Sequence, residues 1–143
     1  MRPVRIALLL GMALLCTAAA RPLTICTPGP YIVFFEWGSA KLDTQAIAIL
    51  DNLLDNLKHC DAASLAYDGS LVDLAVDGHT DTSEADAVSW ARADAVHLFF
   101  RDHEVAEKRI KALGHGAKQL RITTPPDIRE NQNRRVEVVL GPP

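Results

Sequence analysis

Short apolar runs and helically spaced apolar stripes alternate along the chain. Residues 31–35, YIVFF, form a continuous run of β-branched and aromatic side chains, which predicts a buried strand. In residues 43–59 apolar side chains recur at helical spacing with Asp and Asn on the other faces, which predicts an amphipathic helix. A loop at 60–70 then leads to a second predicted strand at 71–76, LVDLAV.

The second half of the chain predicts two further helices and two further strands. We expect a long helix at 84–102 and a short helix at 105–113 that is closed by Gly114. Strands are expected at 120–123 and at 135–140, RVEVVL. Apolar helix stripes beside a few strands indicate a two-layer α/β domain.

One basic residue lies on the apolar face of the long helix at 84–102, for which Ser83 is the predicted N-cap. Val88 and Phe99 belong to one helical stripe, and Arg92 falls in the middle of it. An unpaired charge is costly to bury, so a guanidinium on this face needs a partner. The pattern therefore marks Arg92 as a residue with a structural or a ligand-binding partner.

The first twenty residues have the pattern of a secretory signal peptide. Arg2 and Arg5 precede an apolar run at 6–15, and small residues lead to a predicted cleavage site after Ala20. The run is shorter than the ~18–20 residues of a spanning helix, so an uncleaved anchor is less favoured, as is a lipid on Cys16. We expect residues 1–20 to be removed, 21–30 to form a Pro-rich lead-in and 31–143 to form one domain.

The chain after the predicted cleavage site is mildly acidic. Without Arg2 and Arg5 it keeps 13 of the 15 Lys and Arg against 18 Asp and Glu, a net charge of −5, which argues against nucleic acid as a partner. It also keeps Cys26 and Cys60. An oxidising compartment lets such thiols pair, but the spacing leaves a disulfide and two free thiols equally open.

Sequence signals for catalysis are weak. The sequence shows no nucleophile elbow, P-loop or paired-carboxylate motif, and nothing in it implies a cofactor. His79, Asp81 and His115 form the best candidate metal group, but they have no further spacing pattern. The residues therefore favour neither an enzyme nor a metal site.

Four segments carry a resemblance to a known family. The segment YIVFFEWGSAKLDTQAIAIL resembles the first strand and helix of the OmpA-like domain. VDGHTD followed by SWARADAV resembles its G-H-T-D and R-A core motif, ALGHG its G-x-G, and RENQNRRVEVVL its closing N-R-R-V-E strand. The resemblance implies an α/β (α+β) two-layer sandwich, with a mixed sheet of about four strands and two main helices plus a short helix on one face.

The family resemblance also implies a function. The OmpA-like domain is the peptidoglycan-binding module of outer-membrane protein A, peptidoglycan-associated lipoproteins and flagellar stator proteins. It implies non-catalytic binding of peptidoglycan through the diaminopimelate of the stem peptide. We expect a periplasmic protein of a Gram-negative bacterium that is anchored to the cell wall. Association with the outer membrane or with other envelope proteins is left open.

The resemblance carries a ligand site onto this chain. In the family the Asp of G-H-T-D and the Arg of R-A grip diaminopimelate, which implies Asp81 and Arg92. Arg134 is implied as a further carboxylate contact, with Thr80 and Asn133 beside it. A zwitterionic ligand end needs an anion and a cation close together with little water, because exposed ion pairs contribute only ~0–1 kcal/mol. Arginine also offers planar, bidentate donors to a carboxylate.

Two departures from the family pattern open an alternative. The segment between Asp81 and Arg92 is shorter than in typical members and lacks their Gly and Asn, and Gly38 stands where members often have Asp or Asn. The alternative is an OmpA-like fold repurposed as a periplasmic protein–protein interaction module, with weak or no peptidoglycan binding. The same residues also have structural roles as alternatives to ligand contact. These are a turn at Asp81, an Asp81–Arg92 ion pair, and stabilisation of the loop before the last strand by Asn133 and Arg134.

Overall fold

The structure is a computed structural model that describes residues 28–59 and 73–141. The predicted signal peptide, most of the Pro-rich lead-in, and both Cys26 and Cys60 lie outside the described residues. The elements are β1 (Tyr31–Phe34), α1 (Thr44–His59), β2 (Asp73–Gly78), α2 (Ala87–Asp102), a one-turn 3-10 helix (Glu107–Arg109), β3 (Ile110–Gly114) and β4 (Arg135–Gly141).

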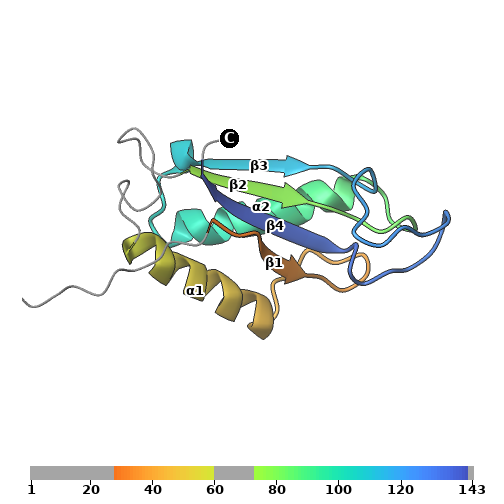
Figure 1. Cartoon of the computed structure of the whole chain (residues 1–143), viewed down its shortest axis with the longest axis horizontal. Helices are drawn as coiled ribbons and strands as arrows, with labels where there is room; N and C mark the ends of the chain where they lie inside the picture. Colours follow the sequence, from red (N-terminus) through yellow and green to blue (C-terminus); the bar gives the residue numbers. More distant parts are fainter. Residues whose placement is uncertain (1–27, 60–72, 142–143) are drawn as a thin grey trace, which may run out of the picture.

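The four strands form one mixed sheet in the order β1-β4-β2-β3. β4 is antiparallel to both β1 and β2, whereas β2 and β3 run parallel. The helix α1 packs against β1, and α2 packs against β2 and β3, so the helices form one layer and the sheet the other (Figure 1). This confirms the α/β two-layer prediction.

Alternation along the strands places the core between the two layers. In β4, Val136, Val138 and Leu140 are buried and point toward the helices, because successive side chains of a strand face opposite sides. The helices meet them with apolar side chains such as Leu53 of α1 and Phe100 of α2. Within the described ranges, no helix combines the length and hydropathy needed to cross a bilayer.

The third strand of the sheet is not where the sequence pattern predicts it. Residues 105–113, expected to be a short helix, contain the one-turn 3-10 helix and then β3. The expected strand at 120–123 is loop. Lys, Ala and Leu favour a helix in isolation, but Ile110–Gly114 pairs with β2 along its whole length. Tertiary pairing overrides local propensity in this segment.

The helix α2 begins at Ala87, three residues later than predicted, and Ser83 is not its N-cap. The Ser83 side chain instead donates a hydrogen bond to Asp81. The buried residues of α2 are Ser89, Arg92, Ala93, Val96 and Phe100. The stripe is therefore rotated slightly from the predicted one, but Arg92 lies in the middle of it as expected.

Gly78 sets the distance between the end of β2 and the start of α2. A Cβ atom at Gly78 would collide with the backbone carbonyl oxygen of Ser89. Only a residue without a side chain permits this close approach of strand and helix. The loop that follows β2, residues 79–86, is thereby held against the first turns of α2.

Candidate ligand-binding site

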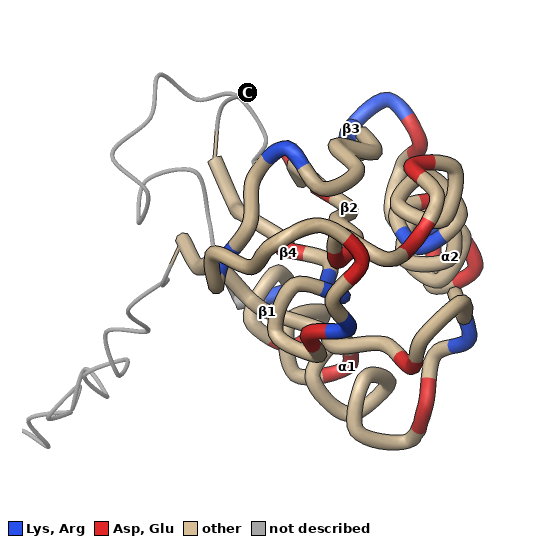
Figure 2. Tube along the Cα trace, turned by 90° about the vertical axis from the view of Figure 1, so that its right-hand side faces the viewer, with Lys and Arg blue, Asp and Glu red and all other residues tan. Residues whose placement is uncertain are grey.

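The predicted site residues gather at one end of the sheet. β1, β2 and β3 end there, and α2 and β4 begin there, as the right-hand side of Figure 1 shows. Three loops meet at this end: residues 35–43, 79–86 and 115–134. Figure 2 views this end of the molecule and shows acidic and basic residues interspersed across it.

Arg92 is buried and pairs with Glu84. Its Nη2 lies 2.7 Å from Oε1 of Glu84 and its Nη1 lies 2.8 Å from Oε2, the bidentate geometry that suits a guanidinium and a carboxylate. The side chains are 0% and 1% exposed. An ion pair this deep is costly to break from one side, because the remaining charge stays buried without compensation.

The remaining donors of Arg92 are held by the main chain. Nε donates to the carbonyl of Ser39 at 2.9 Å, Nη1 to that of His79 at 3.0 Å and Nη2 to that of Glu36 at 3.0 Å. A guanidinium has five N–H donors, so all five donors of Arg92 are used within the protein. The guanidinium also lies 5.4 Å from the centre of the Phe35 ring.

The structural alternative of an Asp81–Arg92 ion pair is wrong, because Asp81 pairs with Arg134, whereas ligand contact by Asp81 and Arg92 stays a prediction. Nη1 of Arg134 lies 2.9 Å from Oδ2 of Asp81, and the backbone N–H of Glu130 donates to the same oxygen at 3.1 Å. Oδ1 accepts hydrogen bonds from the backbone and hydroxyl of Ser83 at 2.9 and 2.8 Å. The loop before α2 thus places Glu84 beside Arg92 and Asp81 beside Arg134.

These contacts keep the Asp81 carboxylate ionised. Burial alone raises the pKa of this carboxyl, but hydrogen bonds from Ser83 and Arg134, with backbone N–H groups of Ser83 and Glu130, outweigh burial and lower the pKa below its ordinary value. Arg134 itself is 11% exposed in its side chain. Its Nε donates to the carbonyl of Phe35, while its Nη2 has no partner among the described residues. Arg134 can therefore donate to a further group at the surface.

Thr80 and Asn133, the other predicted contacts, are both fully buried. Oγ1 of Thr80 is enclosed and has no hydrogen-bond partner in the described part of the chain. The Asn133 amide exchanges two hydrogen bonds with the main chain of Ile122, at 2.9 and 2.8 Å. Asn133 thus organises the loop before β4, which is the structural role considered for it, and ligand contact by either residue stays a prediction.

An exposed aromatic lies at the rim of the site. Trp37 is 44% exposed and its indole N–H donates to the hydroxyl of Ser83 at 2.9 Å. Ser83 in turn donates to Asp81, so Trp37 is linked to the buried carboxylate through one hydroxyl. The guanidinium of Arg129 lies 3.8 Å from the centre of the Trp37 ring, a cation–π contact.

Sequence reasoning did not assign Glu84 and Arg129 to the site. Glu84 lies within the segment that departs from the family pattern, where no motif remains to assign its role. A signal was nevertheless present, since a buried Arg92 requires a carboxylate and Glu84 lies eight residues before it on the adjoining loop. Arg129 comes from a loop without periodicity, and no local pattern places it over Trp37.

The two histidines of the weak candidate metal group are stacked on each other. The rings of His79 and His115 lie 5.2 Å apart, and Nε2 of His115 is 2.7 Å from Oδ1 of Asp77. Burial, followed by the positive charge of Arg135, lowers the pKa of His79 to about 4. Among the described residues there is no group of three or more His, Cys, Asp or Glu that could hold a metal ion.

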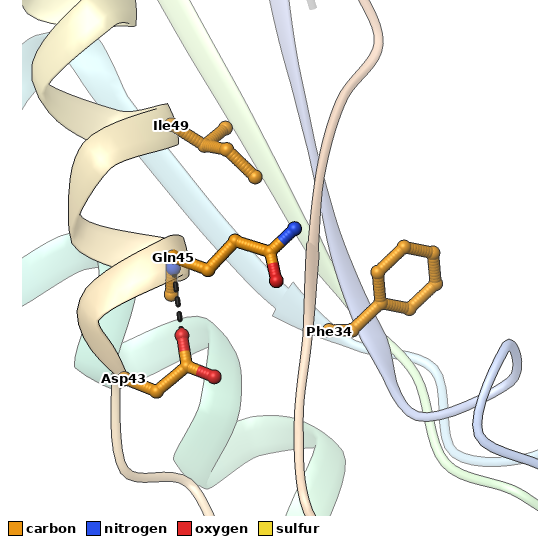
Figure 3. Close-up of a pocket in the computed structure, with 5 residues that line it drawn as sticks. Phe34, Asp43, Gln45 and Ile49 are labelled. Carbon is orange, nitrogen blue, oxygen red and sulfur yellow. Dashed lines mark hydrogen bonds between the residues drawn. The ribbon is translucent and has the colours of Figure 1, made fainter.

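A small hollow of about 30 Å³ lies away from both ion pairs, between the end of β1 and the start of α1. Figure 3 shows Phe34, Asp43, Gln45 and Ile49 around it, with the Asp43 carboxylate accepting a hydrogen bond from the main chain of α1. That bond, 2.7 Å from the N–H of Ala46, caps the helix. The hollow therefore belongs to the helix start and shares no residue with the predicted ligand site.

Comparisons with known proteins agree with this fold. An outer membrane protein from Gluconacetobacter diazotrophicus is 29% identical over 120 residues, which cover 77% of this chain but only 29% of that relative's length. The peptidoglycan-associated lipoprotein of Burkholderia pseudomallei has a TM-score of 0.62 at 21% identity, over 77% of this chain and 89% of that one. The cell wall anchor of the T6SS from Pseudomonas aeruginosa has a TM-score of 0.59 at 21% identity, over 78% and 81%.

The C-terminal domain of Helicobacter pylori MotB is similar to the same extent, with a TM-score of 0.61 at 18% identity, over 80% of this chain and 85% of that one. At these identities the structural matches establish the fold. The sequence model of the OmpA family matches residues 34–134, a range that contains both Arg92–Glu84 and Asp81–Arg134. The chain belongs to the OmpA family.

Proposed function

We propose that this domain binds peptidoglycan without catalysis, through the diaminopimelate of the stem peptide, and so anchors its protein to the cell wall in the periplasm. Membership of the OmpA family supports the general role. Two proteins of similar structure support the same role, since one is a peptidoglycan-associated lipoprotein and the other is a cell wall anchor. The match covers less than a third of the outer membrane protein from Gluconacetobacter diazotrophicus, so the function of that whole protein does not transfer to this chain. We therefore include attachment to the outer membrane or to an envelope protein only as part of this proposal.

The observation that carries the proposal is the Asp81–Arg134 pair at the end of the sheet where β1, β2 and β3 end. The free end of diaminopimelate has one ammonium and one carboxylate. Asp81 is held ionised below the surface, and Arg134, whose side chain is 11% exposed, keeps unused donors, so a buried anion lies 2.9 Å from a cation that a ligand can reach. A largely desolvated pair of this kind interacts far more strongly with a second pair of charges than exposed side chains do.

Sedimentation with diaminopimelate-type sacculi tests the proposal. Wild type is expected to co-sediment, and Arg134→Gln is expected to lose most of its retention because it removes the cation. Arg101→Gln is the matched control, since Arg101 is an exposed arginine paired with Asp102 at the other end of α2. Circular dichroism must show both variants folded. Equal retention of wild type, Arg134→Gln and Arg101→Gln contradicts the assignment of the site.

A second function is favoured by a specific observation, the use of all five Arg92 donors inside the protein. A domain that lost its ligand could keep Arg92 as a structural ion pair and act as a periplasmic protein–protein interaction module. Trp37 and Arg129 then offer an exposed contact surface. This alternative predicts no retention on sacculi, together with capture of an envelope protein that Trp37→Ala abolishes and Trp90→Ala, a change at another exposed tryptophan, does not.

A further inference from the structure

We propose that Arg92 and the turn after β1 form a carboxylate receptor that Glu84 fills in the unliganded protein, and that a ligand carboxylate enters by displacing Glu84. The identity of that ligand as a diaminopimelate stem peptide rests on the proposed function, in which Arg134 meets the carboxylate at the free end of diaminopimelate. The carboxylate that enters the receptor is a second one of the same peptide. The receptor itself rests on the contacts of Arg92 and Glu84. Glu84 is then an internal competitor that sets how tightly the domain binds its ligand.

The receptor is oriented without help from Glu84. Three carbonyl groups, those of Glu36, Ser39 and His79, hold one N–H each and fix the plane of the guanidinium. The two N–H groups that remain point the same way and form a fork for one carboxylate. A site positioned by the main chain keeps its shape when its occupant changes, which is the requirement for exchange of one carboxylate for another.

A further donor completes the receptor. The backbone N–H of Gly38, which has a φ of +66°, lies 2.6 Å from Oε1 of Glu84. Glycine adopts this left-handed conformation readily, whereas a side chain there is strained. The turn at Gly38 therefore presents its backbone N–H to the carboxylate as one further donor.

Glu84 is held chiefly through its side chain. The main chain of Glu84 makes no hydrogen bond with any described residue, and Ala85 and Asp86 after it are exposed. α2 begins only at Ala87, so Glu84 is not fixed by helical hydrogen bonds. An outward movement of Glu84 therefore breaks the contacts of one carboxylate and little else.

Exchange of carboxylates also preserves the charge balance of the buried site. Displacement of Glu84 alone would leave Arg92 buried and unpaired, which costs several kcal/mol. A ligand carboxylate restores the pair as it enters. The backbone N–H of Asp81 lies 3.4 Å from Oε2 of Glu84, so the receptor directly adjoins the Asp81–Arg134 pair.

The competition has a measurable consequence. When the competent state is populated only in part, the apparent dissociation constant rises in inverse proportion to that fraction. Removal of the Glu84 carboxylate should therefore tighten binding of a diaminopimelate-containing tripeptide by about tenfold or more, which corresponds to a shift of at least about 1.4 kcal/mol. Glu84→Ala empties the receptor, and Glu84→Gln replaces one acceptor oxygen by a donor that opposes Arg92.

Chemical rescue tests the receptor without peptidoglycan. The melting temperature of Glu84→Ala should rise with added formate or acetate and level off, because a small carboxylate occupies the vacated site. Chloride at equal ionic strength should have no such effect. Asp43→Ala is the matched control, since it removes a carboxylate that caps α1 without leaving a buried guanidinium. A rescue of Glu84→Ala that exceeds the response of Asp43→Ala supports the receptor.

The two measurements separate the receptor from the proposed function. Rescue by formate without tripeptide binding to any variant supports the receptor and contradicts the assigned ligand. Absence of rescue, together with tripeptide affinity of Glu84→Ala and Glu84→Gln equal to or below that of wild type, overturns the receptor. Retention of wild type on sacculi then decides the proposed function by itself. If Glu84→Ala does not fold, the rescue is measured by the same criterion on Glu84→Ser, whose short side chain also vacates the site.

Discussion

The guanidinium of Arg92 and the carboxylate of Glu84 form a buried fork, with Nη2–Oε1 and Nη1–Oε2 distances of 2.7 and 2.8 Å. This relationship explains why a basic residue occupies the middle of the buried stripe of α2. The aliphatic stem packs among apolar neighbours while the charged head reaches a partner at the end of the sheet. The backbone carbonyls of Glu36 and Ser39 tie the loop after β1 to α2, and that of His79 ties the loop after β2 to the same helix.

Loss of the guanidinium should destabilise the domain strongly. Arg92→Met leaves Glu84 buried without its partner, which costs about 3–5 kcal/mol of unfolding free energy. Urea unfolding measures the loss. The double change Arg92→Met with Glu84→Leu should recover part of it, because no unpaired charge remains. A double variant as unstable as the sum of the two single variants would show that the two residues do not interact.

Acidification from pH ~6.5 to ~4 should weaken the fold through protonation of His79. His79 has a pKa of about 4 in the folded protein against about 6.5 in an unfolded chain, so the unfolded state binds the proton first. The stabilising contribution is complete above pH ~6.5 and declines as pH falls toward ~4, by at most about 3 kcal/mol. Unfolding free energy measured between these pH values should fall in wild type and fall less in His79→Asn. Parallel curves for the two proteins would contradict the assignment.

Asp81 should respond to the removal of Arg134. In wild type its pKa lies below the ordinary value, because hydrogen bonds from Ser83 and Arg134 outweigh the effect of burial. Its contribution to stability is therefore present above the ordinary pKa and lost as pH falls below it. Arg134→Gln removes one of these contacts and should raise the pKa of Asp81, as read from the carboxyl carbon shift in an NMR titration. Arg101→Gln should leave that titration unchanged.

Close packing at the start of α2 makes Gly78 intolerant of any side chain. Gly78→Ala places a Cβ against the carbonyl oxygen of Ser89, a backbone atom that cannot move without moving the helix. Overpacking of this kind typically costs about 1–3 kcal/mol. Thermal unfolding should show a lower midpoint for Gly78→Ala. An unchanged midpoint would mean that α2 can shift away from β2, and that the loop carrying Asp81 is not held as described.

Hydrophobic patterning was sufficient to locate most of the sheet and both helices, because their residues repeat with the period of the element they form. β1, α1 and β4 begin or end within one residue of the predicted positions, and the fold class follows from their order. β3 was not predicted as a strand, because Ile110–Gly114 is short and rich in residues that favour a helix. Its strand conformation depends on parallel pairing with β2, a partner distant in sequence that local patterns do not reveal.

The sequence was sufficient to predict which charged residues gather at the candidate site, but not which of them form ion pairs with each other. Asp81, Arg92 and Arg134 do converge at one end of the sheet, yet the structure joins Asp81 to Arg134 and Arg92 to Glu84. Periodicity along α2 places Arg92 on the buried face but says nothing about the loop before the helix. The partner of Arg92 is set by the path of residues 79–86, which no periodic pattern describes.

Calorimetric titration of wild type with two matched tripeptides tests the central claim most directly. The peptides differ only at the third residue, which is diaminopimelate in one and lysine in the other, so they share the ammonium and differ in the terminal carboxylate. A site built from Asp81 and an arginine should bind the diaminopimelate peptide at least about tenfold more tightly, because only that peptide carries a carboxylate beside the side-chain ammonium for a charge-assisted bidentate pair. Equal affinities, or no detectable binding of either peptide, would contradict the account.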